Sequence, residues 1–395
     1  MNKFLEKLQI KLTPRFISKI QRIESKVNSL NEKIDFANNK LLSINIFYNN
    51  LLNNITNINN FYKLNLNREA YNHRLYDNNK YNIAIVKCTG NLNIGNEFIN
   101  AGGIYLLRKI FSNSKFYEYE FLDSATIDNY KYPTPALLNK DIKEIESNCD
   151  IMFLLCGSII SLRAKNILFE LSKIKIRKVM LGASCLIYDE NEKSLCYSLQ
   201  SLYDEIFCRD NITYSLFGNS FNVYSAIDLA FFTDYISKND NYICNYGGGY
   251  ALINIDLIRD NMQVIEYYKQ LLKEQYKNVY VYENTSNTYY DIQDFIYAGY
   301  WDSIYKLIAK ADFIVTNRIH TSLVCISNSV SFKYIGEDNA ETIGRSSLFN
   351  MINFRLEKDK IYNKDDLKEY TKIIEEKKHD FVNLLKSIYC SDKDA

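Results

Sequence analysis

Short apolar runs alternate with amphipathic helical stretches from residue 82 onward, and this alternation restricts the fold more than any other feature of the chain. Strands that alternate with helices build parallel βαβ units, because two parallel strands need a long crossover connection. The apolar runs lack strict alternation of apolar and polar residues, as expected for strands that helices cover on both faces. The sequence therefore predicts an α/β protein with parallel sheets.

The alternation comes in two sets. The predicted strands and helices of the first set span residues 82–88, 98–111, 150–156, 162–174, 178–181, 195–203 and 206–208. Those of the second set span residues 251–255, 262–275, 279–282, 303–309, 313–316, a helix that begins at 320, and 330–335. A polar stretch separates the two sets and predicts a domain boundary, which agrees with a chain of 395 residues at ~100–200 residues per domain.

Ahead of this region, apolar residues recur at alternating steps of three and four between Ile20 and Ile58. A repeat of 3.5 residues keeps one seam of a helix facing a partner helix. One interpretation is a coiled coil that makes a homo-oligomer through residues 16–58, and the other is a long helix folded back on the body. The Asn-rich stretch 49–60 has poor helix propensity, so the helix is expected to fray after Tyr48.

These patterns predict a division of the chain into five parts. They are an amphipathic start with a coiled-coil helix at 1–60, a connector at 61–81, Rossmann-like domains at 82–240 and 241–355, and a C-terminal helix at 356–395. Basic residues recur every four positions from Lys3 to Lys19, which fits either a peripheral contact with an anionic membrane or a solvated basic face. The sequence has no apolar run of about 18 residues and no signal peptide, so a cytoplasmic protein is expected, with peripheral contact at the inner membrane face as an option.

Composition excludes several classes of function. Lys and Arg number 48 against 47 Asp and Glu, so no overall positive field favours a nucleic-acid partner. The nine cysteines include no Cys-x-x-Cys pair and the three histidines have no metal-binding spacing, so reduced thiols and no metal are expected. No cofactor motif is present either.

The loop after the first predicted strand contains Asn93, Gly95, Asn96 and Glu97 and runs into a helix. A glycine permits close backbone approach, and a helix N-terminus offers unpaired N–H groups to an anion or a sugar hydroxyl. A plain strand-to-helix turn is the alternative.

A sharper signal follows the strand at 313–316, where Asn317, Arg318, His320 and Thr321 open a helix. In parallel sheets, ligands bind at the carboxyl ends of the strands. A guanidinium and a titratable imidazole at such an end suit anion binding and proton transfer, whereas a core histidine is the alternative.

Another strand end carries Arg209 and Asp210, with Ser215 on the following helix. Arg209 either reaches an anion across the cleft or pairs with a neighbouring acid. Further on, Asp228 lies within an apolar run, which is more typical of a structural hydrogen-bonding group than of a catalyst.

The order of these motifs resembles that of the polysaccharide pyruvyl transferases over about residues 82–350. The resemblance implies a two-domain fold similar to GT-B glycosyltransferases and transfer of pyruvate from phosphoenolpyruvate onto two hydroxyls of a sugar, forming a ketal. By motif match, Arg209, Arg318 and His320 take the roles of anion binding and acid/base chemistry.

The chain departs from this family at three places. It has Asn96 where an Asp is usual, Gly157-Ser158 where a Gly-Gly pair is usual, and no Lys over 336–340, so that Arg345 is the nearest downstream cation. Two alternatives therefore stay open: a GT-B-type glycosyltransferase that uses a nucleotide sugar, and a catalytically inactive coiled-coil scaffold.

The predicted partners are a donor, phosphoenolpyruvate or a nucleotide sugar, and an acceptor, a glycan or a lipid-linked sugar. His320, Arg318 and Arg209 are the predicted catalytic residues. The predicted substrate-binding residues are Asn93, Gly95, Asn96, Glu97, Asn317, Thr321, Ser215 and Arg345.

Overall fold

The structure is a computed structural model. It describes residues 26, 81–88, 94–121, 139–162, 164–218, 220–237, 249–256, 261–282, 295–296, 301–337 and 339–390. The predicted coiled coil and membrane-contacting start lie outside these residues except for Lys26, the connector lies outside them except for Tyr81, and Asn93 is also outside. Both sheets described below belong to one compact unit, residues 74–395.

The first sheet has six parallel strands in the order β2-β1-β3-β4-β5-β6. Its strands are β1 (Asn82–Cys88), β2 (Lys115–Phe121), β3 (Ile151–Leu155), β4 (Arg177–Ala183), β5 (Glu205–Cys208) and β6 (Val223–Ser225). The helices between them are α3 (Ile94–Ile110), α4 (Asn139–Asn148), α5 (Lys165–Ser172), α6 (Glu190–Gln200) and α7 (Asn211–Leu216). Strands β3 and β5 are buried along their whole length, which explains why their sequences are continuous apolar runs.

The second sheet has the order β12-β11-β10-β7-β8-β9, and all its strand pairs are parallel except β11 with β12. Its strands are β7 (Tyr250–Asn254), β8 (Asn278–Tyr282), β9 (Phe295–Ile296), β10 (Phe313–Thr316), β11 (Ser331–Tyr334) and β12 (Ile361–Tyr362). The helices are α8 (Thr233–Ser237), which precedes β7, and α9 (Met262–Lys273), α10 (Trp301–Ala309), α11 (Ile319–Ser327) and α12 (Ala340–Ser346). The short 3-10 helices are η2 (Leu229–Phe232) and η3 (Ser347–Ile352).

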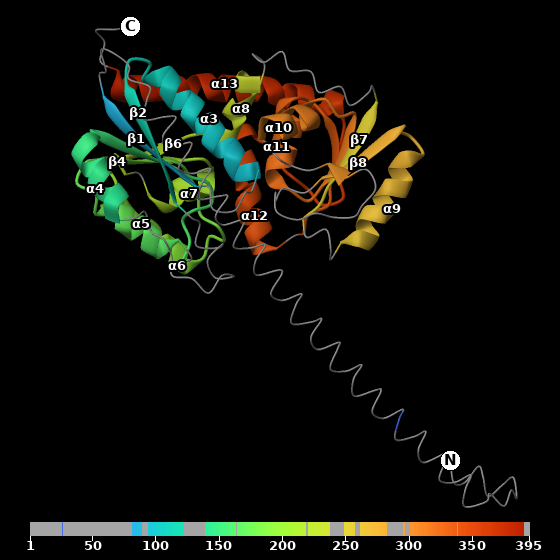
Figure 1. The fold of residues 1–395 in the computed structure, drawn as a ribbon, viewed down its shortest axis with the longest axis horizontal. Coiled ribbons are helices and arrows are strands. Elements are labelled where there is room, and N and C mark those ends of the chain that lie inside the picture. The colour runs from blue at the N-terminus through green and yellow to red at the C-terminus, as the bar shows by residue number, and fades with distance from the viewer. Residues whose placement is uncertain are drawn as a thin grey trace, which may run out of the picture. The chain divides into compact units, whose positions relative to one another are not determined.

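Helices from both halves form a layer between the two sheets (Figure 1). The largest core cluster joins one face of each sheet through apolar side chains of α3, α10, α11 and α13 (Lys364–Tyr389). The outer face of the first sheet packs against α4, α5 and α6, and the outer face of the second packs against α9. Two parallel-dominated α/β sheets are thus present, which confirms the predicted fold class at that level.

The C-terminal helix α13 returns from the second sheet to the first. Its Phe381 lies beside Phe207 of β5, with ring centroids 5.8 Å apart, and its Tyr389 lies 5.6 Å from Phe153 of β3. The chain therefore crosses between the halves twice, once after α8 and once through α13.

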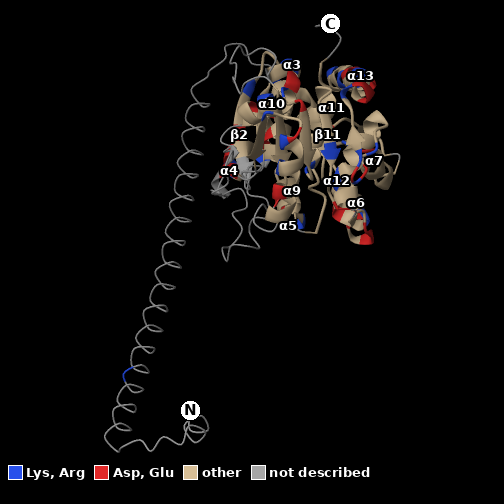
Figure 2. Cartoon of the chain, turned by 90° about the vertical axis from the view of Figure 1, so that its right-hand side faces the viewer, with Lys and Arg blue, Asp and Glu red and all other residues tan. Residues whose placement is uncertain are grey.

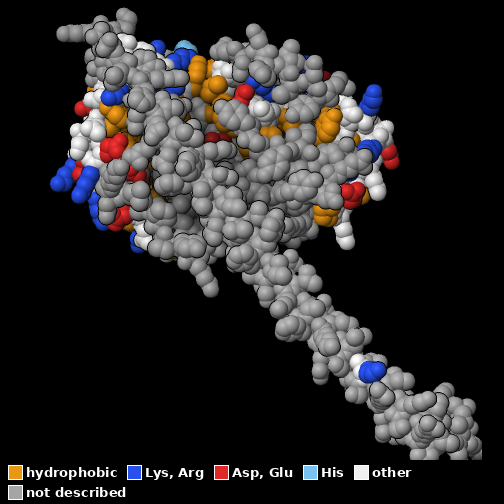
Figure 3. All heavy atoms as spheres, in the orientation of Figure 1, with side chains coloured by type: hydrophobic (Ala, Val, Ile, Leu, Met, Phe, Trp, Pro, Cys, Tyr) orange, Lys and Arg blue, Asp and Glu red, His pale blue; other side chains and the backbone are white. Residues whose placement is uncertain are grey.

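The molecular surface is polar and mixed in sign. Figure 2 shows basic and acidic residues interspersed over the body, in keeping with the net charge of +1. In Figure 3, hydrophobic side chains drawn in orange are visible at several places on the body, beside charged ones. Among the described residues, no helix is long and apolar enough to span a bilayer.

Candidate functional site

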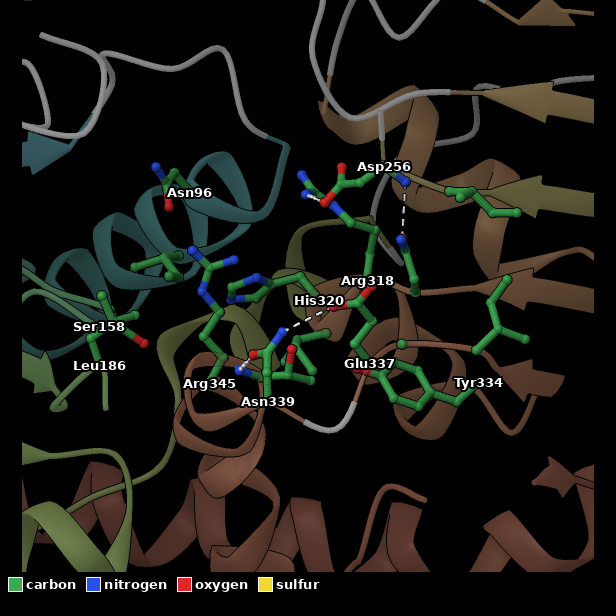
Figure 4. Close-up of a pocket in the computed structure, with 18 of the residues that line it drawn as sticks. Asn96, Ser158, Leu186, Asp256, Arg318, His320, Tyr334, Glu337, Asn339 and Arg345 are labelled. Carbon is green, nitrogen blue, oxygen red and sulfur yellow. Dashed lines mark hydrogen bonds and ion pairs between the residues drawn. The ribbon is translucent and has the colours of Figure 1, made fainter. Parts of the chain in front are cut away.

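A cavity of about 650 Å³ lies where the carboxyl ends of the two sets of strands meet (Figure 4). Its walls come from the start of α3, the loops after β3, β4, β5, β7, β10 and β11, and helix α12. In Figure 4, Asn96 and Ser158 approach from the first sheet, whereas Asp256, Arg318 and Tyr334 approach from the second. This position is where open parallel sheets bind ligands.

Arg209, at the end of β5, is fixed in place by three hydrogen bonds. Its Nε donates to Ser184 Oγ at 2.8 Å, its Nη1 to Asp228 Oδ2 at 2.5 Å and its Nη2 to Ser158 Oγ at 2.6 Å. The guanidinium is 2 % exposed and lines the cavity. Asp228 also accepts from the N–H of Ala230 and is fully buried, so it holds Arg209 as a structural partner.

Arg318 is the residue that precedes the first turn of α11. Its N–H donates to Thr316 Oγ1 at 2.9 Å, and its guanidinium forms an ion pair with Asp256, which follows β7. Asn317 supports this pair because its Oδ1 accepts from the N–H of Asp256 at 2.9 Å. All of these residues except Thr316 line the cavity.

Arg345 reaches the cavity from α12, where it forms an ion pair with Glu341 one turn earlier. Helix α12 sits close to the loop after β4, because a Cβ at Gly344 would lie 1.9 Å from the carbonyl oxygen of Leu186. Burial, together with the nearby Arg318 and Arg209, lowers the pKa of Arg345. The close packing at Gly344 thus brings a third guanidinium to the cavity.

His320 lies in the first turn of α11, and its Nε2 is buried without a hydrogen-bond partner among the described residues. Burial lowers its pKa to about 4, and the three arginines act in the same direction against the opposing effect of Asp228. The imidazole is therefore neutral at pH 7 and presents a nitrogen that no protein group in the described structure satisfies.

The other predicted binding residues divide into two groups. Asn96 and Asn317 line the cavity, whereas Gly95 and Glu97 belong to α3 but do not line it. Thr321 is buried behind the cavity.

Two hydroxyls predicted to bind substrate are used within the protein instead. Thr321 Oγ1 donates to Asn254 Oδ1 at 2.6 Å, and Ser215 Oγ donates to the carbonyl of Asn211 at 2.7 Å. Ser215 does not line the cavity, because its hydroxyl turns back onto its own helix.

Sequence reasoning did not assign Ser158, Asp256 or Lys358 to the site, although all three line the cavity. Ser158 and Asp256 follow strands β3 and β7, so their place at strand ends was the available signal. Lys358 comes from the segment between η3 and β12, far along the chain from β11, and no local pattern indicates its position. It brings a lysine to the cavity although residues 336–340 contain none.

Among the described residues, no group of three or more His, Cys, Asp or Glu side chains is arranged to hold a metal ion. The described cysteines with buried side chains include Cys156, Cys208 and Cys325, and burial raises the pKa of each thiol. These thiols are protonated at neutral pH and are not poised as nucleophiles.

Fold and cavity together define a two-sheet α/β protein with an arginine-lined site at the strand ends, suited to an anionic substrate. The family model for polysaccharide pyruvyl transferases matches residues 93–339. The chain belongs to this family and is accordingly a transferase, which confirms the resemblance seen in its motifs.

No curated protein sequence gives a significant match. Among solved structures, the chain is similar to the S. aureus MnaA–UDP co-structure, with a TM-score of 0.46, 11% identity, and coverage of 78% of this chain and 91% of that one. It is also similar to UDP-GlcNAc 2-epimerase from Neisseria meningitidis bound to UDP-GlcNAc, with a TM-score of 0.46, 10% identity, and coverage of 78% and 98%.

Proposed function

We propose that this chain transfers pyruvate from phosphoenolpyruvate to a sugar of a surface glycan or of its lipid-linked precursor, forming a ketal. The observation that carries the proposal is the convergence of Arg209, Arg318 and Arg345 on a neutral His320 whose Nε2 has no partner among the described residues. Family membership supports the same reaction class.

The arginines suit the donor. Phosphoenolpyruvate carries a carboxylate and a phosphate, and guanidinium groups bind both kinds of oxyanion in a bidentate manner. They also stabilise the negative charge that gathers on the departing phosphate. A cavity of about 650 Å³ is within the range of small-molecule sites, with room for the donor beside a sugar residue.

His320 suits the proton transfers. Ketal formation joins both acceptor oxygens to the central carbon of phosphoenolpyruvate while the C–O bond from that carbon to phosphate breaks. Of the two hydroxyl protons, one is added to the methylene carbon and the other leaves with the phosphate. A neutral imidazole accepts a hydroxyl proton directly, and the negative donor beside it raises its pKa above the value of about 4 in the unliganded site. We assign His320 the role of general base toward the acceptor.

Calorimetric titration of the full chain with phosphoenolpyruvate, beside a panel of nucleotides and nucleotide sugars, tests the donor. We expect saturable phosphoenolpyruvate binding that weakens by about tenfold or more in Arg318→Ala, because a charge-assisted hydrogen-bond pair contributes about 1.5–3 kcal/mol. Arg355→Ala is the matched control, since Arg355 is exposed and does not line the cavity.

A different outcome would redirect the assignment. If the wild-type chain ignores phosphoenolpyruvate but binds one nucleotide sugar saturably, the glycosyltransferase alternative replaces pyruvyl transfer. If it binds no donor of either class, the inactive-scaffold alternative gains support.

A further inference from the structure

Ser158 stands in the loop after β3, at one of the positions where the chain departs from its family's glycine pair. Its side chain faces the cavity and its Oγ accepts from Arg209 Nη2 at 2.6 Å (Figure 4). A glycine there would leave this guanidinium nitrogen without that protein partner.

The hydroxyl of Ser158 accepts two hydrogen bonds from described residues. A serine hydroxyl has one proton to donate and two lone pairs to accept with. Arg209 Nη2 fills one lone pair, and the hydroxyl of Ser184 donates toward the other, at an Oγ–Oγ distance of 3.4 Å. Among the described residues, none accepts a hydrogen bond from the hydroxyl of Ser158 itself, although the residue lines the cavity.

The residue before Ser158 keeps the cavity open next to Arg209. A Cβ at Gly157 would lie 3.4 Å from Arg209 Nη1 and 3.0 Å from Ile99 Cδ1. Any side chain at residue 157 would therefore crowd both Ile99 and the guanidinium of Arg209. Gly157 thus lets the backbone pass close to Arg209, while Ser158 accepts a hydrogen bond from its Nη2.

We propose that Ser158 is an additional substrate-binding residue, whose hydroxyl donates its proton to the same oxyanion that Arg209 binds. The proposal rests on the proposed function for the identity of the donor, but the group recognised is any carboxylate or phosphate oxygen. Arg209 draws electron density from Ser158 Oγ through its own hydrogen bond, which strengthens the hydroxyl as a donor to an anion. Ser158 thereby adds an uncharged donor to the arginines of the site.

The test compares Ser158→Ala with Ser184→Ala by calorimetry, using phosphoenolpyruvate and inorganic phosphate as separate probes on the full chain. We expect Ser158→Ala to weaken binding of phosphoenolpyruvate by about tenfold, because it removes a hydrogen bond to a charged group. Ser184→Ala removes the other hydroxyl that holds Arg209 but no donor in the cavity, so its loss is expected to be about threefold or less. Ser198→Ala, on α6 away from the cavity, should bind as the wild type does.

The outcomes separate this proposal from the proposed function. Equal losses in Ser158→Ala and Ser184→Ala would show that both serines only position Arg209, and unchanged affinity in Ser158→Ala would likewise overturn the proposal. A wild-type chain that binds phosphate but not phosphoenolpyruvate would end the pyruvyl assignment, while the phosphate series still decides the role of Ser158. Binding of neither probe would overturn both. If phosphate and phosphoenolpyruvate weaken together, the contact is to the phosphate; loss for phosphoenolpyruvate alone places it on the carboxylate.

Discussion

The pKa of His320 is set by the burial and the charges around its side chain. Burial, together with the positive charges of Arg209, Arg318 and Arg345, disfavours a positive charge on its ring and lowers its pKa to about 4. A ligand with negative charge relieves this environment. The histidine and the anion are therefore coupled through charge, without a direct contact being necessary.

We predict that this coupling appears as a pH dependence of stability. The pKa of His320 is about 4 in the folded chain against ~6.5 when unfolded, so the unfolded state binds more protons between these values. Stability should be intact above about pH 6.5 and fall as the pH drops toward 4, by up to about 3 kcal/mol from this residue. Urea unfolding at a series of pH values measures it.

Two histidine variants test whether His320 causes this dependence of the unfolding free energy on pH. His320→Gln should unfold with a smaller loss between pH 6.5 and 4, whereas His379→Gln, on the exposed side of α13, should follow the wild-type curve. Identical curves for His320→Gln and wild type would show that the slope arises elsewhere.

At the scale of elements, helix α3 packs unusually close to η2. A Cβ at Gly102 would lie 2.0 Å from the carbonyl oxygen of Leu229, whereas a Cβ at Gly103 would meet methyl groups of Leu155 at 2.9 Å and 3.0 Å. A side chain can move aside for an added Cβ more easily than the backbone can. This contact places η2, and with it Asp228, beneath the cavity.

We predict that Gly102→Ala destabilises the chain by about 1–3 kcal/mol, as overpacking against backbone does, despite the better helix propensity of alanine. Gly103→Ala is the matched control one residue away and should lose clearly less, since the atoms nearest its Cβ are methyl groups of Leu155 and Leu229 and not backbone. Thermal and urea unfolding compare the two. A stable Gly102→Ala variant would contradict the close approach of α3 and η2.

Buried parallel strands are the elements that the sequence predicts best. The predicted strand at 82–88 agrees with β1, and the one at 313–316 agrees with β10, because buried parallel strands are short apolar runs. Strand β2 was missed because it alternates aromatic and acidic residues. The side chain of its Glu118 is nearly buried and forms an ion pair with Lys87 at 3.0 Å. The distribution of apolar residues along the sequence does not reveal that an acidic residue will be buried in such a pair.

The site was predictable where it depends on local rules. Arg318 and His320 follow a strand directly, and the carboxyl end of that strand reaches the cavity. Arg345 was predicted as the nearest downstream cation and lines the cavity, whereas the place of Lys358 depends on how distant segments pack. The hydroxyl of Ser215 bonds to its own helix, which the spacing of residues does not indicate. Spacing along the chain does not decide such questions of tertiary packing.

At the scale of the whole molecule, a buried ionic cluster joins helix α13 to helix α8, the two elements at which the chain passes between its halves. Lys378 of α13 is 1 % exposed, and its Nζ donates to Asp234 Oδ2 of α8 at 2.7 Å and to Glu375 Oε1 at 2.8 Å. It also lies 4.5 Å from the ring centroid of Tyr235. The cluster fastens α13 to the segment that leads into the second sheet.

We predict that Lys378→Met destabilises the chain by about 3–5 kcal/mol, because it removes the buried ammonium group from its ion pair with Asp234. Adding Asp234→Asn should recover part of this loss, since a buried negative charge is removed as well. Lys372→Met, exposed on the same helix, should change stability by less than about 0.5 kcal/mol. Urea unfolding of the four proteins checks this, and a neutral Lys378→Met would contradict the cluster's role.

The return of α13 to the first sheet also sets the order in which the molecule is completed during its synthesis. Phe153 and Phe207 leave the ribosome long before Phe381 and Tyr389, the rings that cover them. Until the last turns of α13 emerge, this face of the nascent first sheet lacks the cover that Phe381 and Tyr389 provide. A ribosome that stalls or terminates ahead of residue 364 would therefore release a chain whose earliest sheet is unfinished, although every one of its strands has been made.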